Sequence, residues 1–141
     1  MDRRDFMRLS MVGAAGSLLL SRQVLAEAAA TSLAGGVYYT QEAPGHWKGK
    51  EATHLPSLEI AKSDSKVIVT VLTAHEMKGY EHYIVKHVLL DKNYQFLDEH
   101  LFDPTKDKTA LSVFNLKSYT GALYALSMCN KHDVWLSSAT V

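Results

Sequence analysis

The sequence has little cysteine, little arginine and no long apolar run, and each shortage excludes a class of protein. A single cysteine, Cys129, excludes a disulfide framework. All four arginines lie within the first 22 residues, and beyond residue 26 the chain has 11 lysines against 13 acidic residues. That balance leaves no basic patch for a nucleic acid. The apolar run Leu9–Leu20 is too short to span a bilayer about 30 Å thick, which favours a cleaved signal over the alternative of an uncleaved anchor.

What is present is the composition of one globular domain. The 141 residues are 47% apolar and 21% charged, with 8 Gly and 3 Pro. This composition excludes disorder, collagen and a multi-span membrane protein. A chain of this length builds one core, and it is too short for two comfortable domains.

The first 26 residues have the three parts of an export signal: a charged start, a short apolar run and a small residue at the end. Arg3 and Arg4, followed by Phe6, resemble a twin-arginine signal, the route of proteins that are exported already folded. We therefore predict export by the twin-arginine machinery and a periplasmic location. Cleavage is expected after Ala26, with cuts two or four residues later as alternatives.

The remainder of the chain alternates short, β-branched apolar runs with turn residues. No segment shows a sustained helical period, and the runs recur about every 10–15 residues. The expected strands are 37–40, 67–73, 82–90, 94–97, 109–116, 121–128 and 134–141. About seven strands favour an all-β fold, an immunoglobulin-like antiparallel β-sandwich, with a small barrel as the alternative. Residues 27–45 are predicted to be a flexible leader and residues 46–141 the folded domain.

Histidines and the one cysteine carry the predicted chemistry. Cys129 and His132 lie three residues apart just after an expected strand, where a turn can direct both side chains to one point. His75 and His82 flank a glycine-containing loop after the strongest strand, and His54 lies in an extended loop. Loops at one end of a sandwich can bring these three segments together.

Such a donor set leaves several metals open. Imidazole suits iron, copper, zinc and nickel, and a thiolate adds a soft donor. Structural zinc favours closed sets of four ligands with more cysteines. Blue copper takes two histidines, one cysteine and a weak methionine, for which Met77 or Met128 is available. Four histidines with one cysteine are one ligand too many for that site and indicate five-coordinate iron with an open sixth position.

Short motifs around these histidines follow one another over most of the chain beyond the export signal. They are Gly49–Pro56, His75-x-Met77, Glu81–Ile84, and Cys129-Asn-x-His132 with Trp135. In order and near spacing they resemble the superoxide reductase family, the neelaredoxins and desulfoferrodoxins. The resemblance extends from roughly Lys48 to Trp135, and the family's immunoglobulin-like sandwich agrees with the strand pattern.

The resemblance implies one iron per chain, held in a square pyramid by four equatorial histidines and an axial cysteine. Carried over by motif, the ligands are His54, His75, His82 and His132, with Cys129 axial. Members of the family with a second, rubredoxin-like iron site have four cysteines near the N-terminus. No cysteine precedes Cys129, so this chain is similar to the one-iron form.

The chain departs from the family just before its first histidine. Members usually have Glu-Lys there, where the lysine attracts superoxide and the glutamate can bind the oxidised iron. Ala52 and Thr53 occupy those places, with Glu51 and Lys50 further upstream. We predict that Lys50 and Glu51 take over the two catalytic roles, with Lys48 as an alternative for the lysine.

The resemblance implies an oxidoreductase that converts superoxide to hydrogen peroxide at an iron cycling between Fe2+ and Fe3+. An unknown periplasmic donor would supply the electrons, and a homo-oligomer is expected because family members form dimers and tetramers. The alternative is a non-catalytic periplasmic metal-binding or electron-transfer module, which the loss of Glu-Lys favours. His46, His87 and His100 are expected to have no role.

Overall fold

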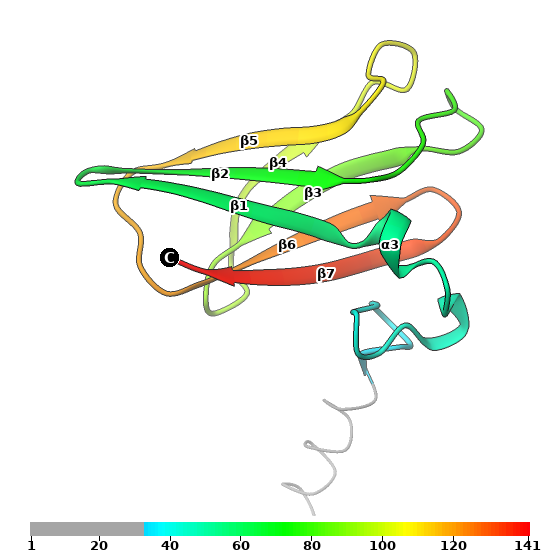
Figure 1. Cartoon of the computed structure of the whole chain (residues 1–141), viewed down its shortest axis with the longest axis horizontal. Helices are drawn as coiled ribbons and strands as arrows, with labels where there is room; N and C mark the ends of the chain where they lie inside the picture. The colour runs from blue at the N-terminus through cyan, green and yellow to red at the C-terminus, as the bar shows by residue number, and fades with distance from the viewer. Residues whose placement is uncertain (1–32) are drawn as a thin grey trace, which may run out of the picture. The chain divides into compact units, whose positions relative to one another are not determined.

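Seven strands form two antiparallel sheets in the computed structural model, which describes residues 33–141 (Figure 1). One sheet has the order β1-β2-β5 and the other the order β4-β3-β6-β7. The bounds are β1 Pro56–Ser63, β2 Lys66–Thr73, β3 Ile84–Leu90, β4 Phe96–Leu101, β5 Ala110–Leu116, β6 Ala122–Cys129 and β7 Asp133–Thr140. This arrangement confirms the immunoglobulin-like β-sandwich expected from the sequence.

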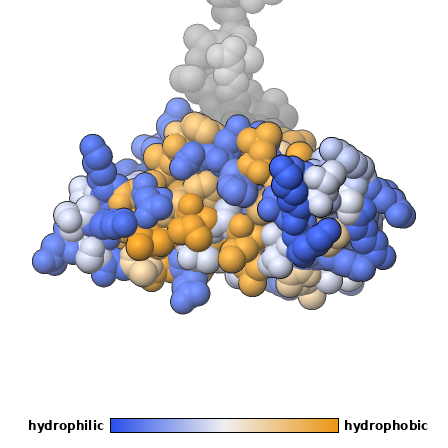
Figure 2. All heavy atoms as spheres, turned by 90° about the horizontal axis from the view of Figure 1, so that it is seen from above, coloured by the Kyte–Doolittle hydropathy of each residue, from blue (hydrophilic) through white to orange (hydrophobic). Residues whose placement is uncertain are grey.

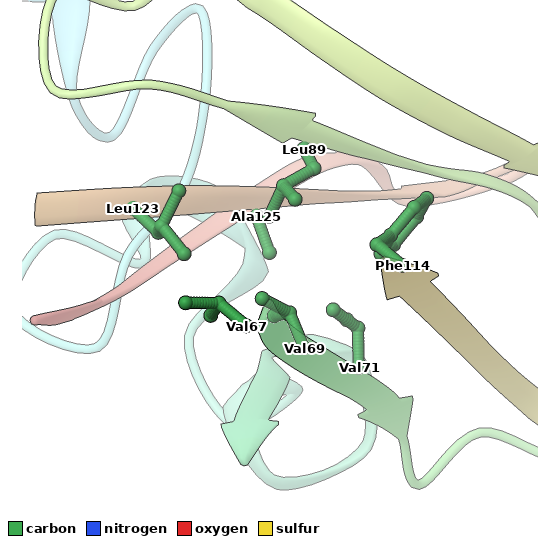
Figure 3. Packing of buried hydrophobic residues seen from close by; sticks show 7 residues of the cluster. All are labelled: Val67, Val69, Val71, Leu89, Phe114, Leu123 and Ala125. Atoms are coloured by element: carbon green, nitrogen blue, oxygen red, sulfur yellow. The ribbon is translucent and has the colours of Figure 1, made fainter. Parts of the chain in front are cut away.

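Strict alternation in the two central strands builds the core between the sheets. In β2 every second residue is buried, and β6 alternates in the same way. We call the resulting cluster the main core; its buried residues are Val67, Val69, Val71, Leu89, Phe114, Leu123 and Ala125 (Figure 3). Burial of each larger side chain contributes roughly 1.5–3 kcal/mol to the stability of the fold, and it holds the two sheets together.

Two of the seven strands differ from the expected set. Strand β4 extends from Phe96 to Leu101, whereas the expected strand covers 94–97. Strand β1 was not predicted, whereas residues 37–40 form only isolated bridges instead of a strand. Strand β1 is an edge strand that pairs with β2 alone, and it buries Pro56 fully but Leu58 and Ile60 only partly. Its apolar alternation is therefore too weak to stand out from its polar neighbours.

The later part of the segment predicted to be a flexible leader packs on β7. Tyr39 is only 2% exposed, and its ring lies 5.5 Å from that of Trp135. Its backbone N–H donates to the carbonyl of Val134, and its carbonyl accepts from the N–H of Leu136. The predicted export signal, its cleavage site and residues 27–32 lie outside the described residues.

Two short helices lie between Gly45 and His54, and some apolar side chains remain exposed. A 3-10 helix, η1 (Gly45–Trp47), and a single turn, α3 (Glu51–His54), precede β1. Within residues 33–141, no helix is long and apolar enough to cross a membrane. Leu72, Leu111 and Val113 are exposed on the neighbouring strands β2 and β5. Figure 2 shows a face on which apolar side chains gather between hydrophilic ones.

Candidate metal centre

Three loops meet at one end of the sandwich because of the strand register. Pro56 at the start of β1 pairs with Thr73 at the end of β2. Cys129 at the end of β6 pairs with both Ile84, where β3 starts, and Asp133, where β7 starts. The α3 turn, the β2–β3 loop and the β6–β7 turn therefore lie at the same edge, on the right of Figure 1.

Five candidate ligands from these segments come together in what we call the donor cluster. Its members are His54, His75, His82, Cys129 and His132, and their ligand atoms all lie within 4.8 Å of one another. Nδ1 of His132 is 3.0 Å from Nε2 of His54 and 3.1 Å from Nε2 of His82. The Sγ atom of Cys129 lies 3.5 Å from Nδ1 of His132. Four ring nitrogens and one sulfur thus face a common point.

Hydrogen bonds outside the donor cluster orient its rings. Nδ1 of His54 is 2.9 Å from the carbonyl oxygen of Lys50. A carbonyl can only accept, so Nδ1 carries the proton and Nε2 presents a free lone pair to the cluster. The indole N–H of Trp135 donates to the carbonyl of His132 at 2.8 Å, which fixes the turn that carries this histidine.

Asn130 ties two of the loops together. Its Oδ1 accepts from the N–H of Tyr83 at 3.0 Å. Its side-chain amide donates to the carbonyls of Tyr80 and Glu81. The turn between Cys129 and His132 is thereby held against the segment that carries His82. The sequence contained the asparagine within a motif but gave no signal for these partners, which lie 47 to 50 residues away.

Burial keeps the imidazoles neutral. It is the largest cause that lowers the pKa of His54 and of His75, each to about 4, and their histidine neighbours lower both further. The pKa values of His82 and His132 are also lowered, first by burial and then by nearby lysines. Burial raises the pKa of the Cys129 thiol. Neutral imidazoles are the form that binds metal, and a coordinated thiol loses its proton to the ion.

The donor set fits a transition metal with several nitrogen ligands. An unprotonated Nε2 of His54 faces a second ring nitrogen at 3.0 Å, an arrangement that a cation between the rings satisfies. Imidazole and thiolate together suit iron, copper or zinc. Five donors exceed the tetrahedral set typical of structural zinc. Of the two methionines considered for a copper site, Met128 lies on the opposite face of β6 from Cys129. The sulfur of Met77 lies 3.4 Å from the backbone nitrogen of Ile84.

Comparison with known proteins identifies the family. The sequence profile of the Desulfoferrodoxin family matches residues 46–138, about two thirds of the chain. The chain belongs to the desulfoferrodoxin family. Among curated proteins, no sequence matches it significantly.

Solved structures similar to this chain include superoxide reductases. A variant of the superoxide reductase (neelaredoxin) from Ignicoccus hospitalis is 27% identical, with a TM-score of 0.61, over 76% of this chain and 94% of that one. A superoxide reductase crystallised in the oxidised state is 28% identical, with a TM-score of 0.55, over 69% and 93%. The superoxide reductase from Nanoarchaeum equitans, at 18% identity and a TM-score of 0.57, covers 64% and 94% and shares the fold.

The two residues predicted to be catalytic lie beside the donor cluster but not in it. Lys50 precedes α3, and its charge contributes to the lowered pKa of His82 and His132. Glu51 is not among the clustered ligands, and its Oε2 accepts from the backbone N–H of Gly49 at 2.7 Å. The Glu51 carboxylate therefore stabilises its own turn.

The three histidines without an expected role lie outside the donor cluster. His46 and His100 are exposed, whereas His87 is fully buried between the sheets. Both ring nitrogens of His87 lie within hydrogen-bond distance of side-chain hydroxyls, Thr73 on one side and Ser112 on the other. No local pattern in the sequence reveals this contact, because its partners lie 14 and 25 residues away.

Proposed function

We propose that this chain is a superoxide reductase, which reduces superoxide by one electron to hydrogen peroxide. The observation that carries the proposal is the convergence of four ring nitrogens and one sulfur on a single point. One iron per chain would supply the electron when bound there, passing from Fe2+ to Fe3+, and two protons from solvent complete the peroxide. The proposed ligands are His54, His75, His82, His132 and Cys129.

Burial of three of the five proposed ligands closes one side of the donor cluster to solvent and leaves the other side open. His54, His75 and Cys129 are buried, so the interior holds their side of the cluster away from solvent. His82 and His132 are partly exposed. A small anion would therefore reach the donor cluster from the side of these two histidines.

We further propose that Lys50 draws the superoxide anion toward this side. After burial, and together with the charge of Lys131, its charge is among the causes that lower the pKa values of His82 and His132. A lysine near the entrance raises the rate at which an anion arrives. Glu51 remains our candidate for closing the site after turnover, and it would have to release the N–H of Gly49 to do so.

Rapid mixing of the iron-loaded protein with superoxide tests the proposed reaction. We expect one hydrogen peroxide for each superoxide consumed, with the Fe2+ form oxidised and no oxygen released. The variant Cys129→Ser, which keeps the size of the side chain but removes the sulfur, is expected to lose the thiolate absorption band and most of the rate. Decay of superoxide no faster than its spontaneous dismutation, with the iron left as Fe2+, would contradict the proposal.

That contrary outcome would favour electron transfer without catalysis, the second candidate. One observation supports it: Ala52 and Thr53, both exposed, offer no charge just before His54. An electron-transfer protein would be reduced and reoxidised by a redox partner at the same rate with or without superoxide. Measuring both rates on one sample separates the two candidates.

For the cellular setting we propose the periplasm, reached through the twin-arginine machinery, with an unidentified electron donor there. The support is the sequence of residues 1–26. We also propose a homo-oligomer, supported by the apolar side chains of Leu111 and Val113, which are exposed on the edge strand β5. Export of a variant in which lysine replaces Arg3 and Arg4 tests the proposed route. Light scattering of the exported protein tests the proposed homo-oligomer.

A further inference from the structure

Four buried polar side chains join the two sheets, and we call them the polar network. They are Thr73 on β2, Ser112 on β5, His87 on β3 and Ser127 on β6, each at most 2% exposed. Nδ1 of His87 is 2.7 Å from Oγ of Ser112, and Nε2 is 2.9 Å from Oγ1 of Thr73. The same Oγ1 is 2.8 Å from Oγ of Ser127. Strands β2 and β5 of one sheet and β3 and β6 of the other each contribute one member.

The polar network lies next to the donor cluster, two residues further into the sandwich. Ser127 precedes Cys129 by two residues and points into the same interior, since β6 alternates. Thr73 precedes His75 by two residues, and its carbonyl accepts from the N–H of His75 at 2.7 Å. The hydrogen bond between Thr73 and Ser127 therefore connects the end of β2, two residues before His75, with β6, two residues before Cys129.

A single neutral histidine satisfies the whole chain of hydrogen bonds. Burial lowers the pKa of His87 to about 4, so one ring nitrogen donates and the other accepts at neutral pH. If Nδ1 donates to Ser112, the Thr73 hydroxyl donates to Nε2 and accepts from Ser127. The reverse direction works equally well with the other tautomer. Each contact in the network is thus directional, unlike the apolar contacts of the main core.

Stability alone does not account for this arrangement. Replacing a complete set of buried hydrogen-bonding partners by apolar groups of the same shape is often neutral or stabilising. A satisfied polar network instead fixes one arrangement of the elements it joins. Here those elements are the ends of β2 and β6, which deliver His75 and Cys129 to the donor cluster.

We propose that the polar network is a positioning device for Cys129: it sets the spacing of the two sheets beneath the site and hence the approach of Sγ to the metal. Thr73, His87 and Ser127 are then positioning residues, acting through Cys129 and His75. The proposal rests on the metal site assigned under the proposed function. It requires that loss of one hydroxyl in the network changes the metal–sulfur bond while the fold persists.

The variant Thr73→Val tests this, because it removes the hydroxyl at nearly constant volume. The chain, purified without metal, is titrated with Co2+, whose sulfur-to-metal charge-transfer band reports on the bond to Cys129. We expect Thr73→Val to bind one Co2+ with a displaced band and an affinity about 10-fold weaker. Thr73→Ser, which keeps the hydroxyl, is expected to have a band position and a Co2+ affinity close to those of the parent. Thr70→Val, on the opposite face of β2, serves as the matched control.

A folded Thr73→Val protein with the parent's band and affinity would overturn the proposal. If Thr73→Val fails to fold by circular dichroism, Ser127→Ala carries the same measurement, since it removes one oxygen at the end of the network. An unchanged band in Ser127→Ala would then overturn it. This outcome can be distinguished from failure of the proposed function. A parent protein that shows the cobalt–sulfur band but does not consume superoxide contradicts only the proposed reductase activity. A variant whose cobalt–sulfur band is unchanged contradicts only the positioning role.

Discussion

The two ends of the sandwich interior are built from the same strands but from different chemistry. On β2, Val67 and Val69 belong to the main core, and six residues beyond Val67 the strand ends in the polar Thr73. On β6, Leu123 is apolar, and the same face ends in Ser127 and then Cys129. The inward-facing side chains of β2 and β6 therefore change along each strand from the apolar main core to polar groups and a ligand at the metal end.

A small apolar cluster lies beside the sulfur at the metal end. Ile84, Phe102 and Ala110 are buried next to Cys129, with Met77 packed against them. The backbone N–H of Ile84 lies 3.4 Å from the sulfur of Met77, so this methionine packs within the cluster. At the metal end, apolar residues thus surround the sulfur of Cys129, and solvent reaches two of the histidines. The polar network lies next to this end, further into the sandwich.

The largest effect on stability is expected from a substitution that disrupts the main core and leaves the donor cluster intact. Leu123→Ala removes a fully buried side chain between the sheets and should lower the free energy of unfolding by about 2–5 kcal/mol. Urea unfolding of the metal-free protein measures the loss. The Co2+ spectrum of the folded variant should match the parent, and an altered spectrum would show that the two ends are not independent.

Acid should destabilise the metal-free protein through the buried histidines. Burial, followed by the charge of His100, lowers the folded pKa of His87 to about 4 from an ordinary value of 6.5. The unfolded chain therefore binds a proton between these values that the folded chain does not, so stability falls as pH drops from about 6.5 to 4. For His87 alone the loss is about 3 kcal/mol.

Urea titrations at pH 7 and pH 5 test this effect. His87→Gln should flatten the dependence on pH relative to the parent. His46→Gln, at an exposed histidine, is the control and should retain the parent's slope. An equal slope in the parent and in His87→Gln would mean that His87 does not contribute.

The fold was predictable where burial and alternation coincide, and less so elsewhere. Strand β2 alternates over its full length between two neighbours, so its pattern is clear. Strand β1 has one exposed edge and few apolar residues, and it left no such pattern. Tyr39 was assigned to a leader because its burial depends on Trp135, 96 residues further along, which no local pattern reveals.

The donor cluster could be anticipated from spacing because its members flank turns. Cys129 and His132 share one turn, and the structure brings them to His54 and to the β2–β3 loop. The partners that orient these side chains were not anticipated. Asn130 and His87 act on segments distant in sequence, and hydrogen bonds between distant strands depend on the register, which the sequence alone did not define.

A smaller effect is expected from loosening the loop that carries His82. Asn130→Ala removes the contacts to Tyr80, Glu81 and Tyr83 without touching the donor cluster. Because partners of this kind tune metal sites, we expect about 10-fold weaker Co2+ affinity. Asn115→Ala on the exposed face of β5 is the matched control. Equal affinities in both variants would assign the positioning of His82 to other contacts.

The smallest expected effect concerns the charge of Lys50. Lys50→Ala should slow the reaction with superoxide several-fold at low ionic strength, because its charge acts on the open side of the cluster. The difference should vanish as salt shortens the Debye length to about 10 Å at 0.1 M. Lys62→Ala, near the end of β1 away from the α3 turn, removes the same charge and should leave the rate unchanged. If the two variants slow equally, net charge and not the position of Lys50 governs the encounter.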